Sequence, residues 1–351
     1  RGCSTASATS SPRWLWYQSE YSPIGDQAGT VARFECTKMP KRRWFHHVGM
    51  LIGSSLSRTW LVTANPRPTG HTAAVLPSDA ESEVEHESAT LVARTAALET
   101  ELRRLGRVVV AFSGGADSSF LAAAATNVLG ADRVHSVTAV SPSLAGDEEA
   151  DCRALAGELG LRWTPVVTDE MERAAYRLND TDRCYHCKAE LMDVVGPIAA
   201  AERATVGLGV TLDDLGDHRP GQRAATEAGA EFPLVTAGFT KADVRAASKA
   251  MGLRTWDKPA AACLASRIPY GTQVSVEILG RVDRAEAALH RLGFAQVRVR
   301  HYDDTARIEV DLDELPRVVD ARDEIVDAVR RAGYRYVTVD LEGFRSGNLN
   351  G

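Results

Sequence analysis

The segment Ser113–Ser119 has the residue types of a phosphate-binding loop. It reads Ser-Gly-Gly-Ala-Asp-Ser-Ser, follows a β-branched stretch and precedes an apolar segment at 120–129. Glycines let backbone amides approach an anion, and the start of a helix adds free N–H groups and its dipole. Serine hydroxyls can donate to phosphate oxygens, and an aspartate can orient the loop or hold Mg²⁺ between phosphates. The alternative is an ordinary strand–helix turn. The candidate phosphate-binding residues are Ser113, Gly114, Gly115, Asp117, Ser118 and Ser119.

Two further clusters carry cysteines. Cys184 and Cys187 form a Cys-x-x-Cys pair, which can ligate a metal or form a redox disulfide. One pair supplies only two of the four ligands of a tetrahedral zinc site. Cys263 lies in a loop rich in alanine and proline, where Lys258 and Arg267 are close enough in sequence to stabilise a thiolate nucleophile. The structural alternatives are two half-buried thiols and, at Cys263, a small buried hydrophobic side chain.

Charged side chains form two more clusters. Asp213, Asp217 and Arg219 follow a predicted buried strand, where they suit the handling of Mg²⁺ and phosphate or the anchoring of a loop. Arg298 and Arg300 alternate along another predicted strand, so both guanidinium groups face the same side as a fork for phosphate or carboxylate. The alternatives are a solvated acidic turn and a cross-strand ladder of charges.

The elements that must position these clusters alternate in type. The predicted strands are Val108–Ala111, Val134–Val140, Trp163–Val167 and Ala204–Val210, and the predicted helices are 118–129, 148–159 and 184–202, after a leading helix marked by Leu91, Leu98, Leu102 and Leu105. The segment Phe232–Thr236 continues the alternation, as does a helix after Thr240, where Asp243 completes a capping box. This order predicts an α/β fold with a doubly wound parallel sheet, which binds ligands beyond the carboxyl ends of its strands.

A different pattern follows residue 271. Helix 275–292, strands 295–302 and 305–311, helix 313–332 and strand 334–341 predict a smaller C-terminal α+β domain. The predicted boundaries are therefore 86–262 for the sheet domain and 263–351 for the second one. Residues 1–85 hold four of the six tryptophans but no sustained helix or strand period. We predict an ill-defined or disordered extension there, with a partner-binding arm as the alternative.

Bulk composition excludes several classes of protein. The 351 residues are 44% hydrophobic and 25% charged, as in soluble globular proteins. No apolar run reaches the roughly 20 residues that span a bilayer. A net charge of −6 argues against general nucleic-acid binding, and six cysteines favour thiol or metal chemistry over a disulfide scaffold. We expect a cytoplasmic protein with no nucleic-acid and no membrane partner.

The glycine-rich loop lacks the Gly-Lys-Ser/Thr ending of a Walker loop and resembles the PP-loop of the ATP pyrophosphatase superfamily. All the clusters together resemble the LarE family of ATP-dependent sacrificial sulfur transferases. The matching segments, in order, are 113–118, 183–188, 213–221, 256–259, 263–271 and 297–301. The resemblance implies the PP-loop (adenine nucleotide alpha hydrolase-like) fold, ATP held by the glycine-rich loop, Mg²⁺, and a homo-oligomer.

The resemblance also implies a reaction in the biosynthesis of the nickel-pincer nucleotide cofactor of lactate racemase. The small-molecule substrate would be pyridinium-3,5-biscarboxylic acid mononucleotide, whose carboxylates are adenylylated, with release of pyrophosphate, and converted into thiocarboxylates. Cys263 would donate the sulfur and become dehydroalanine. In the alternative route, Cys184, Cys187 and Cys263 hold a [4Fe–4S] cluster that carries the sulfide. The substrate phosphate or carboxylate would be bound by Arg267, Arg298 and Arg300, and the product would pass to other enzymes of the pathway.

Other functions stay open. A tRNA thiolase of the same superfamily would favour a basic surface, and only the N-terminal segment is basic. An amidating synthetase would need an ammonia source, and no glutaminase pattern is visible. A non-catalytic nucleotide-binding protein is a third alternative, although intact Ser113, Asp117 and Cys263 speak against it.

Overall fold

The computed structural model describes residues 79–215, 220–259 and 262–345, all within one compact unit of the chain. Most of the predicted N-terminal extension, residues 1–78, lies outside the described residues. The leading helix, α2 (Asp79–Leu105), begins before the predicted boundary at residue 86. None of the helices in the described part of the chain is both long and apolar enough to span a membrane.

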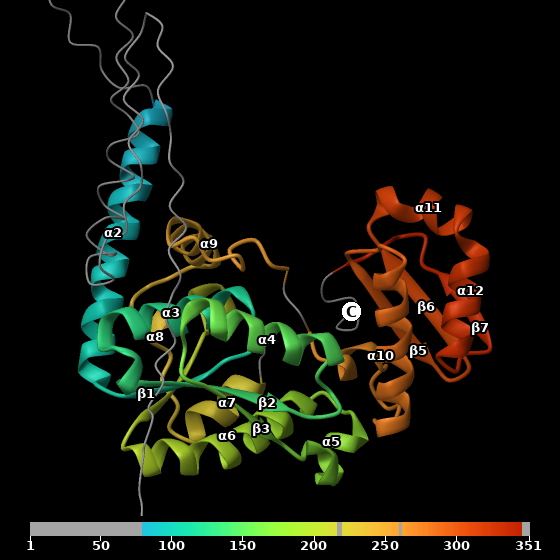
Figure 1. Ribbon diagram of the computed structural model, residues 1–351, viewed down its shortest axis with the longest axis horizontal. Helices are drawn as coiled ribbons and strands as arrows, with labels where there is room; N and C mark the ends of the chain where they lie inside the picture. The colour runs from blue at the N-terminus through green and yellow to red at the C-terminus, as the bar shows by residue number, and fades with distance from the viewer. Residues whose placement is uncertain (1–78, 216–219, 260–261, 346–351) are drawn as a thin grey trace, which may run out of the picture. The chain divides into compact units, whose positions relative to one another are not determined.

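Four parallel strands form the larger sheet, in the order β3-β2-β1-β4 (Figure 1). They are β1 (Val108–Ala111), β2 (Val134–Val140), β3 (Trp163–Val167) and β4 (Thr205–Leu208). In the central strand, Val108 pairs with Val134 on one side and with Thr205 on the other. The predicted parallel α/β sheet is confirmed.

Successive side chains of β1 enter two hydrophobic cores, because side chains alternate across a strand. Val108 and Val110 pack into one core, and Val109 packs into the other. The first face is covered by α2, α3 (Ala116–Leu129), α4 (Gly146–Leu159) and α9 (Lys241–Ala250). The second is covered by α6 (Arg183–Glu202) and α7 (Pro220–Glu227). Burial on both faces explains the unbroken apolar run.

The alternation ends earlier than predicted. The segment Phe232–Thr236 is not a strand but contains a short helix, α8 (Pro233–Thr236), and the chain meets the sheet nearby only in a single bridge between Gly207 and Glu231. Pro233 explains the difference, because it has no N–H to give to a sheet and its fixed φ suits the first turn of a helix. The predicted capping box of α9 is confirmed by hydrogen bonds between Thr240 and Asp243.

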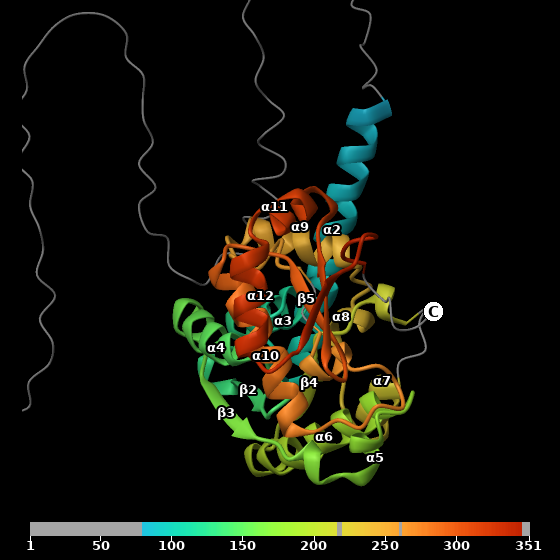
Figure 2. The same cartoon turned by 90° about the vertical axis from the view of Figure 1, so that its right-hand side faces the viewer.

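A second sheet, in the order β5-β6-β7, lies in the C-terminal part of the chain (Figures 1 and 2). Its strands are β5 (Val297–Tyr302), β6 (Thr305–Val310) and β7 (Tyr336–Val339), and its helices are α10 (Val276–Arg291), α11 (Leu315–Asp320) and α12 (Arg322–Arg331). β5 and β6 are antiparallel, whereas β6 and β7 are parallel. The predicted helix 313–332 is interrupted, because Ala321 leaves the helical region at φ −92°, ψ 19°.

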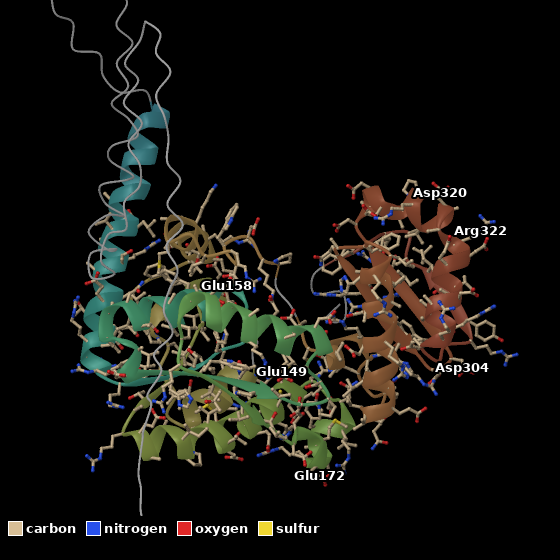
Figure 3. All side chains as sticks on the ribbon, in the orientation of Figure 1. Glu149, Glu158, Glu172, Asp304, Asp320 and Arg322 are labelled. Atoms are coloured by element: carbon tan, nitrogen blue, oxygen red, sulfur yellow. The ribbon has the colours of Figure 1, made fainter. Side chains whose placement is uncertain are left out.

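Charged side chains such as Glu172, Asp304 and Asp320 lie on the outside of the molecule (Figure 3). A second set of charges is buried instead. Besides Glu101 and Asp214, it comprises Glu170, Arg183, Arg267, Glu286, Arg298, Arg300 and Glu309. Because burying a charge is costly unless it is paired, this set marks the part of the protein where function is to be sought.

Candidate active site

The glycine-rich loop has a backbone that only glycine tolerates at Gly114. Its φ is +69°, and a Cβ there would lie 2.8 Å from Sγ of the buried Cys152. Gly115 is the N-cap of α3, so the loop leads directly into a helix N-terminus. The amide of Ser113 donates to Oγ of Ser118 over 3.2 Å, which closes the loop on the first turn of the helix. This geometry suits a bound anion.

The end of β4 also approaches the loop closely. A Cβ at Gly209 would lie 2.8 Å from the backbone nitrogen of Ser118 and 2.9 Å from the carbonyl carbon of Asp117. Gly209 is therefore required for the contact between this strand end and the start of α3.

A cavity of about 620 Å³ opens beside the loop, at the ends of β1, β2 and β4. Its lining brings together several predicted site residues that are far apart in the sequence. They are Ser113, Gly115, Asp117, Ser118, Cys187, Cys263, Arg267 and Arg298, joined by Glu170, Lys188, Lys258, Glu286 and His290. Gly114 and Ser119 do not line the cavity. Ser119 is fully buried, and its hydroxyl has no hydrogen-bond partner among the residues that the structure describes.

The surroundings of Asp117 disfavour the ionised form of its carboxyl group. Burial raises its pKa above the usual value, and the neighbouring charge of Asp214 raises it further, while Lys241 and Arg245 oppose this effect. A bound cation would favour the ionised form of this carboxylate, which lines the cavity, because the cation would offset the cost of its charge.

Asp213 anchors a loop. Its Oδ2 accepts a hydrogen bond of 2.6 Å from the backbone nitrogen of Lys241, at the start of α9. The adjacent Asp214 pairs with Nζ of the same lysine at 3.0 Å and accepts from Thr211. Neither aspartate lines the cavity. The other two residues predicted to handle Mg²⁺ and phosphate, Asp217 and Arg219, lie outside the described residues.

Lys258 contacts the backbone of the glycine-rich loop and two carboxylates of α4. Its Nζ lies 3.3 Å from the carbonyl oxygen of Gly114, 3.1 Å from Glu148 and 2.8 Å from Asp151. Sequence reasoning placed this lysine beside Cys263 and missed the contact with the loop. The acidic partners on α4 explain the difference, because a lysine paired with two carboxylates is held there.

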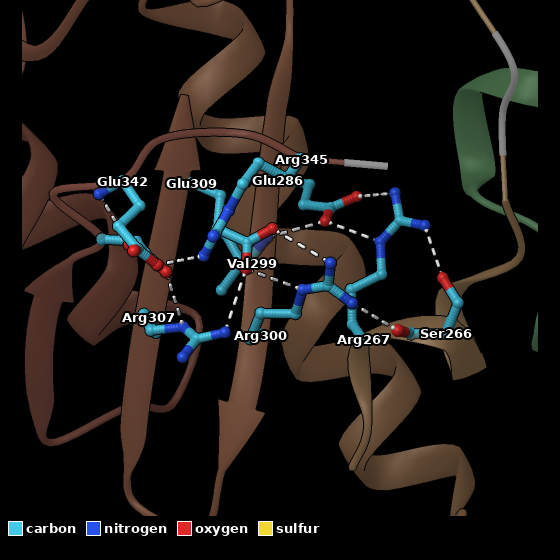
Figure 4. Close-up of polar contacts among 10 residues, drawn as sticks. Ser266, Arg267, Glu286, Val299, Arg300, Arg307, Glu309, Glu342 and Arg345 are labelled. Atoms are coloured by element: carbon cyan, nitrogen blue, oxygen red, sulfur yellow. Dashed lines mark hydrogen bonds and ion pairs between the residues drawn. The ribbon is translucent and has the colours of Figure 1, made fainter. Parts of the chain in front are cut away.

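Two arginines predicted to bind substrate are paired with carboxylates of the protein itself (Figure 4). Arg267 makes two hydrogen bonds of 2.9 Å to Glu286, and Arg300 makes two of 3.0 Å to Glu309. Their remaining N–H groups donate to the chain around Cys263: Arg267 to the carbonyl oxygen of Ala262 at 2.7 Å, and Arg300 to that of Ser266 at 2.8 Å. Arg300 does not line the cavity.

Arg298 differs from both. Its side chain lines the cavity, is 8% exposed and makes no hydrogen bond or ion pair with any residue in the described part of the chain. The guanidinium lies over the ring of Phe344, 4.4 Å from the centroid. Burial and the nearby charges of Arg267 and Arg300 lower its pKa to about 10. A buried, unpaired cation at the cavity wall is ready to receive an anion.

All four cysteines in the described residues are free thiols. Cys263 is exposed and lies at the start of a short 3₁₀ turn, Leu264–Arg267, while Cys184 and Cys187 lie in the first two turns of α6. Burial raises the pKa of Cys187 to about 12, and the neighbouring charge of Cys263 contributes; both thiols line the cavity.

Within residues 79–215, 220–259 and 262–345, no three or more Cys, His, Asp or Glu side chains are grouped so that they could hold a metal ion. Cys184, Cys187 and Cys263 therefore do not form such a group in the described part of the chain.

Comparisons with known proteins place the chain in a family. A family model described as NAD synthase matches residues 90–189, which include the glycine-rich loop. An uncharacterized protein of Synechocystis is 45% identical over 249 residues, 70% of this chain and 92% of the relative. A pyridinium-3,5-bisthiocarboxylic acid mononucleotide synthase of Lactiplantibacillus plantarum is 38% identical over 263 residues, 75% of this chain and 95% of the relative. The chain belongs to the LarE family. The LarE resemblance inferred from the motifs is thereby confirmed, as is the PP-loop fold.

Proposed function

We propose that this LarE-family protein is an ATP-dependent sulfur transferase that converts the carboxylates of pyridinium-3,5-biscarboxylic acid mononucleotide into thiocarboxylates. One observation carries the proposal: a single cavity is lined by the PP-loop, by Cys263 and by the buried, unpaired Arg298. These are an ATP site, a sulfur nucleophile and an anion receptor. The product named for the L. plantarum relative supports this choice of substrate.

In the first step, a carboxylate oxygen of the substrate attacks the α-phosphorus of ATP, and pyrophosphate leaves. The loop amides and the N-terminus of α3 receive the charge that grows on the departing pyrophosphate. Mg²⁺ bound with ATP would neutralise part of that charge. Asp117 would be its protein ligand, since Mg²⁺ commonly takes only one or two carboxylates besides phosphate oxygens and water. A carboxylate is a poor electrophile, and its conversion into an acyl adenylate makes its carbon reactive towards a nucleophile.

In the second step, the thiolate of Cys263 attacks the activated carbonyl carbon and AMP leaves, which gives a thioester. Loss of the Cα proton of Cys263 then supplies the electron pair of the new Cα=Cβ bond. The Cβ–S bond breaks and its electron pair leaves with sulfur. The products are a thiocarboxylate and a dehydroalanine at position 263, and no external oxidant or reductant is needed.

The arginines have two different tasks in this proposal. Arg298 binds the substrate phosphate or the carboxylate that is not reacting. Arg267 and Arg300, paired with Glu286 and Glu309, hold the segment around Cys263 through its carbonyl oxygens. The homo-oligomeric state, the cytoplasmic location and the hand-over of product to other enzymes of the pathway stay predictions.

The proposal is tested by ATP–pyrophosphate exchange and by direct detection of thiocarboxylate. We expect exchange that depends on the biscarboxylate mononucleotide and persists in Cys263→Ser, because activation precedes sulfur transfer. Thiocarboxylate should form only with Cys263 present. Exchange without this substrate, or with an RNA or an amine acceptor instead, would favour the other PP-loop enzymes. ATP binding with no exchange under any condition would favour a non-catalytic nucleotide-binding protein.

A further inference from the structure

A second hollow, of about 460 Å³, lies at the starts of the strands in the larger sheet and takes no part in the proposed reaction. Its lining is Arg107, Arg162, Ala201, Glu202 and Arg203. Arg107 immediately precedes β1, Arg162 immediately precedes β3, and Arg203 comes two residues before β4. The cavity beside the PP-loop opens at the other ends of these strands. Since even the four residues of β1 rise about 3.3 Å each, the two sites are more than about 10 Å apart.

Hydrogen bonds bring the three arginines of this hollow together. Arg162 donates to both carboxylate oxygens of Glu202, over 2.9 Å and 2.6 Å, and Glu202 is the neighbour of Arg203 in the chain. The backbone nitrogen of Thr205 donates to the carbonyl oxygen of Arg107 over 3.0 Å, which ties the residue before β1 to the start of β4. The three arginines therefore line one hollow although they are far apart in the sequence.

The positive charge of the hollow is only partly neutralised. Glu202 is the one carboxylate among the described residues that line it, and Arg162 takes both of its oxygens. Arg107 donates only to the carbonyl oxygen of Asp132, over 3.2 Å. The guanidinium of Arg203 makes no hydrogen bond or ion pair with any described residue. A positively charged hollow lined by guanidinium forks suits phosphate groups, whose oxygens accept from such a fork in pairs.

The backbone of Arg203 is unusual for its residue type. Its φ is +52° and its ψ is 43°, the left-handed conformation in which glycine or asparagine commonly ends a helix. The other non-glycine residues with a positive φ in the described part of the chain are Asn179 and Asp303, whose short polar side chains tolerate it. An exposed arginine at this position costs stability that glycine would not cost, which points to a role for its guanidinium.

We propose that this hollow is a second binding site for linked phosphate groups, those of pyrophosphate or of a nucleoside triphosphate, separate from the PP-loop. Arg107 and Arg203 donate to the phosphate oxygens, while Arg162 is oriented by Glu202 and adds its charge. A short phosphate chain is favoured over an extended polyanion, because the protein as a whole carries a net charge of −6 and would repel one. The proposal does not depend on sulfur transfer.

The test uses the full chain with inorganic pyrophosphate as the probe. Phenylglyoxal modifies accessible arginines, and peptide mass mapping gives the rate at each of them. We expect pyrophosphate to slow the modification of Arg107 and Arg203 by roughly fivefold or more, with half of the effect at or below about 1 mM. Arg322, which is exposed and lies outside the hollow, is the control within the same molecule, and its rate should not change.

Arg203→Gly separates binding from stability, because it removes the guanidinium and suits the left-handed backbone. It should raise the urea midpoint of unfolding, yet the pyrophosphate concentration that half protects Arg107 should rise roughly tenfold. Arg322→Gln removes an equal charge elsewhere and should leave that concentration unchanged. Equal effects of the two variants on the protection of Arg107 would reduce the result to net charge and overturn the proposal.

The same assay on the unaltered protein distinguishes the sources of phosphate. Protection at lower concentration by pyrophosphate than by ATP would assign the site to free pyrophosphate, and the reverse order would assign it to a nucleoside triphosphate. Unchanged rates at Arg107 and Arg203 up to about 10 mM of either would overturn the proposal and leave these arginines only the role of cations near helix ends. Stronger protection by single-stranded RNA at equal phosphate concentration would also overturn it. Failure to make thiocarboxylate would refute the proposed function and leave these rates unaffected.

Discussion

The two sides of the cavity are built on different physical principles. On the PP-loop side, anion binding comes from backbone amides, hydroxyls and glycines within a single stretch, Ser113–Ser119. On the arginine side, it comes from Arg298, a buried guanidinium at the cavity wall, whereas the neighbouring Arg267 and Arg300 are neutralised by carboxylates. The loop therefore depends on local conformation, whereas the arginine side depends on which distant carboxylates reach each cation.

The largest effect on stability is expected on the arginine side. Arg300→Met leaves Glu309, which is fully buried, with a reduced set of cationic partners, and it should lower the free energy of unfolding by about 3 kcal/mol in urea titrations. Replacing both partners, Arg300→Met with Glu309→Leu, should recover more than half of that loss. A single variant as stable as the unaltered protein would contradict the inferred pairing.

Arg298→Met is matched to Arg300→Met, because it removes a buried arginine that has no carboxylate partner among the described residues. Because no carboxylate in the described residues pairs with it, its loss should leave stability within about 1 kcal/mol of the unaltered protein. The KM for the mononucleotide should instead rise roughly tenfold to a hundredfold, since a charge-assisted contact is lost. A large loss of stability with an unchanged KM would assign Arg298 a structural role instead.

On the loop side, Gly114→Ala should reduce ATP–pyrophosphate exchange and lower stability by about 1–2 kcal/mol, because φ is +69° there. The new Cβ would also lie 2.8 Å from Sγ of Cys152, so adding Cys152→Ala should recover part of the loss but not the backbone strain. Gly157→Ala is the control, since a Cβ in that part of α4 meets no atom within 4 Å. Equal effects of the two glycine substitutions would contradict the account of the loop.

The smallest effect concerns the pH dependence of stability at Asp117. Its pKa is raised in the folded protein by burial, so the folded state holds the proton more tightly than the unfolded state does. Ionisation therefore costs stability progressively as pH rises from the ordinary carboxyl range towards neutrality. Asp117→Asn should be more stable than the unaltered protein near pH 7, and this advantage should shrink towards about pH 4. An advantage that grows on acidification would reverse the inferred sign.

Local features were predictable from the sequence. The apolar run Val108–Ala111, the glycines after it and the helix behind them lie within a few residues of one another, so their pattern determines the strand, the loop and the start of α3. The structure departs from the prediction at Pro233, which cannot donate to a sheet, and at Ala321, where the backbone leaves the helical region although the residue type favours a helix. At both places the hydrophobic pattern continues along the sequence, but the predicted strand or helix does not continue in the structure.

The partners of the charged residues were not predictable. Arg183 meets Ala265, 82 residues away in the sequence, and Lys258 meets Gly114, 144 residues away. Arg298 and Arg300 are two residues apart and of the same type, yet only Arg300 meets Glu309 in two hydrogen bonds. Which cation is neutralised is a property of the tertiary structure, and no spacing within β5 distinguishes the two.

The central claim is that Cys263 gives up its sulfur to the substrate. The most direct test is the intact mass of the protein before and after incubation with ATP, Mg²⁺ and pyridinium-3,5-biscarboxylic acid mononucleotide, with peptide mapping of Cys263. We expect the protein to lose about 34 Da, the mass of H₂S, at Cys263, and each protein to deliver at most one sulfur. Thiocarboxylate formed by a protein of unchanged mass would contradict it and would direct attention to a sulfur carrier held by Cys184, Cys187 and Cys263.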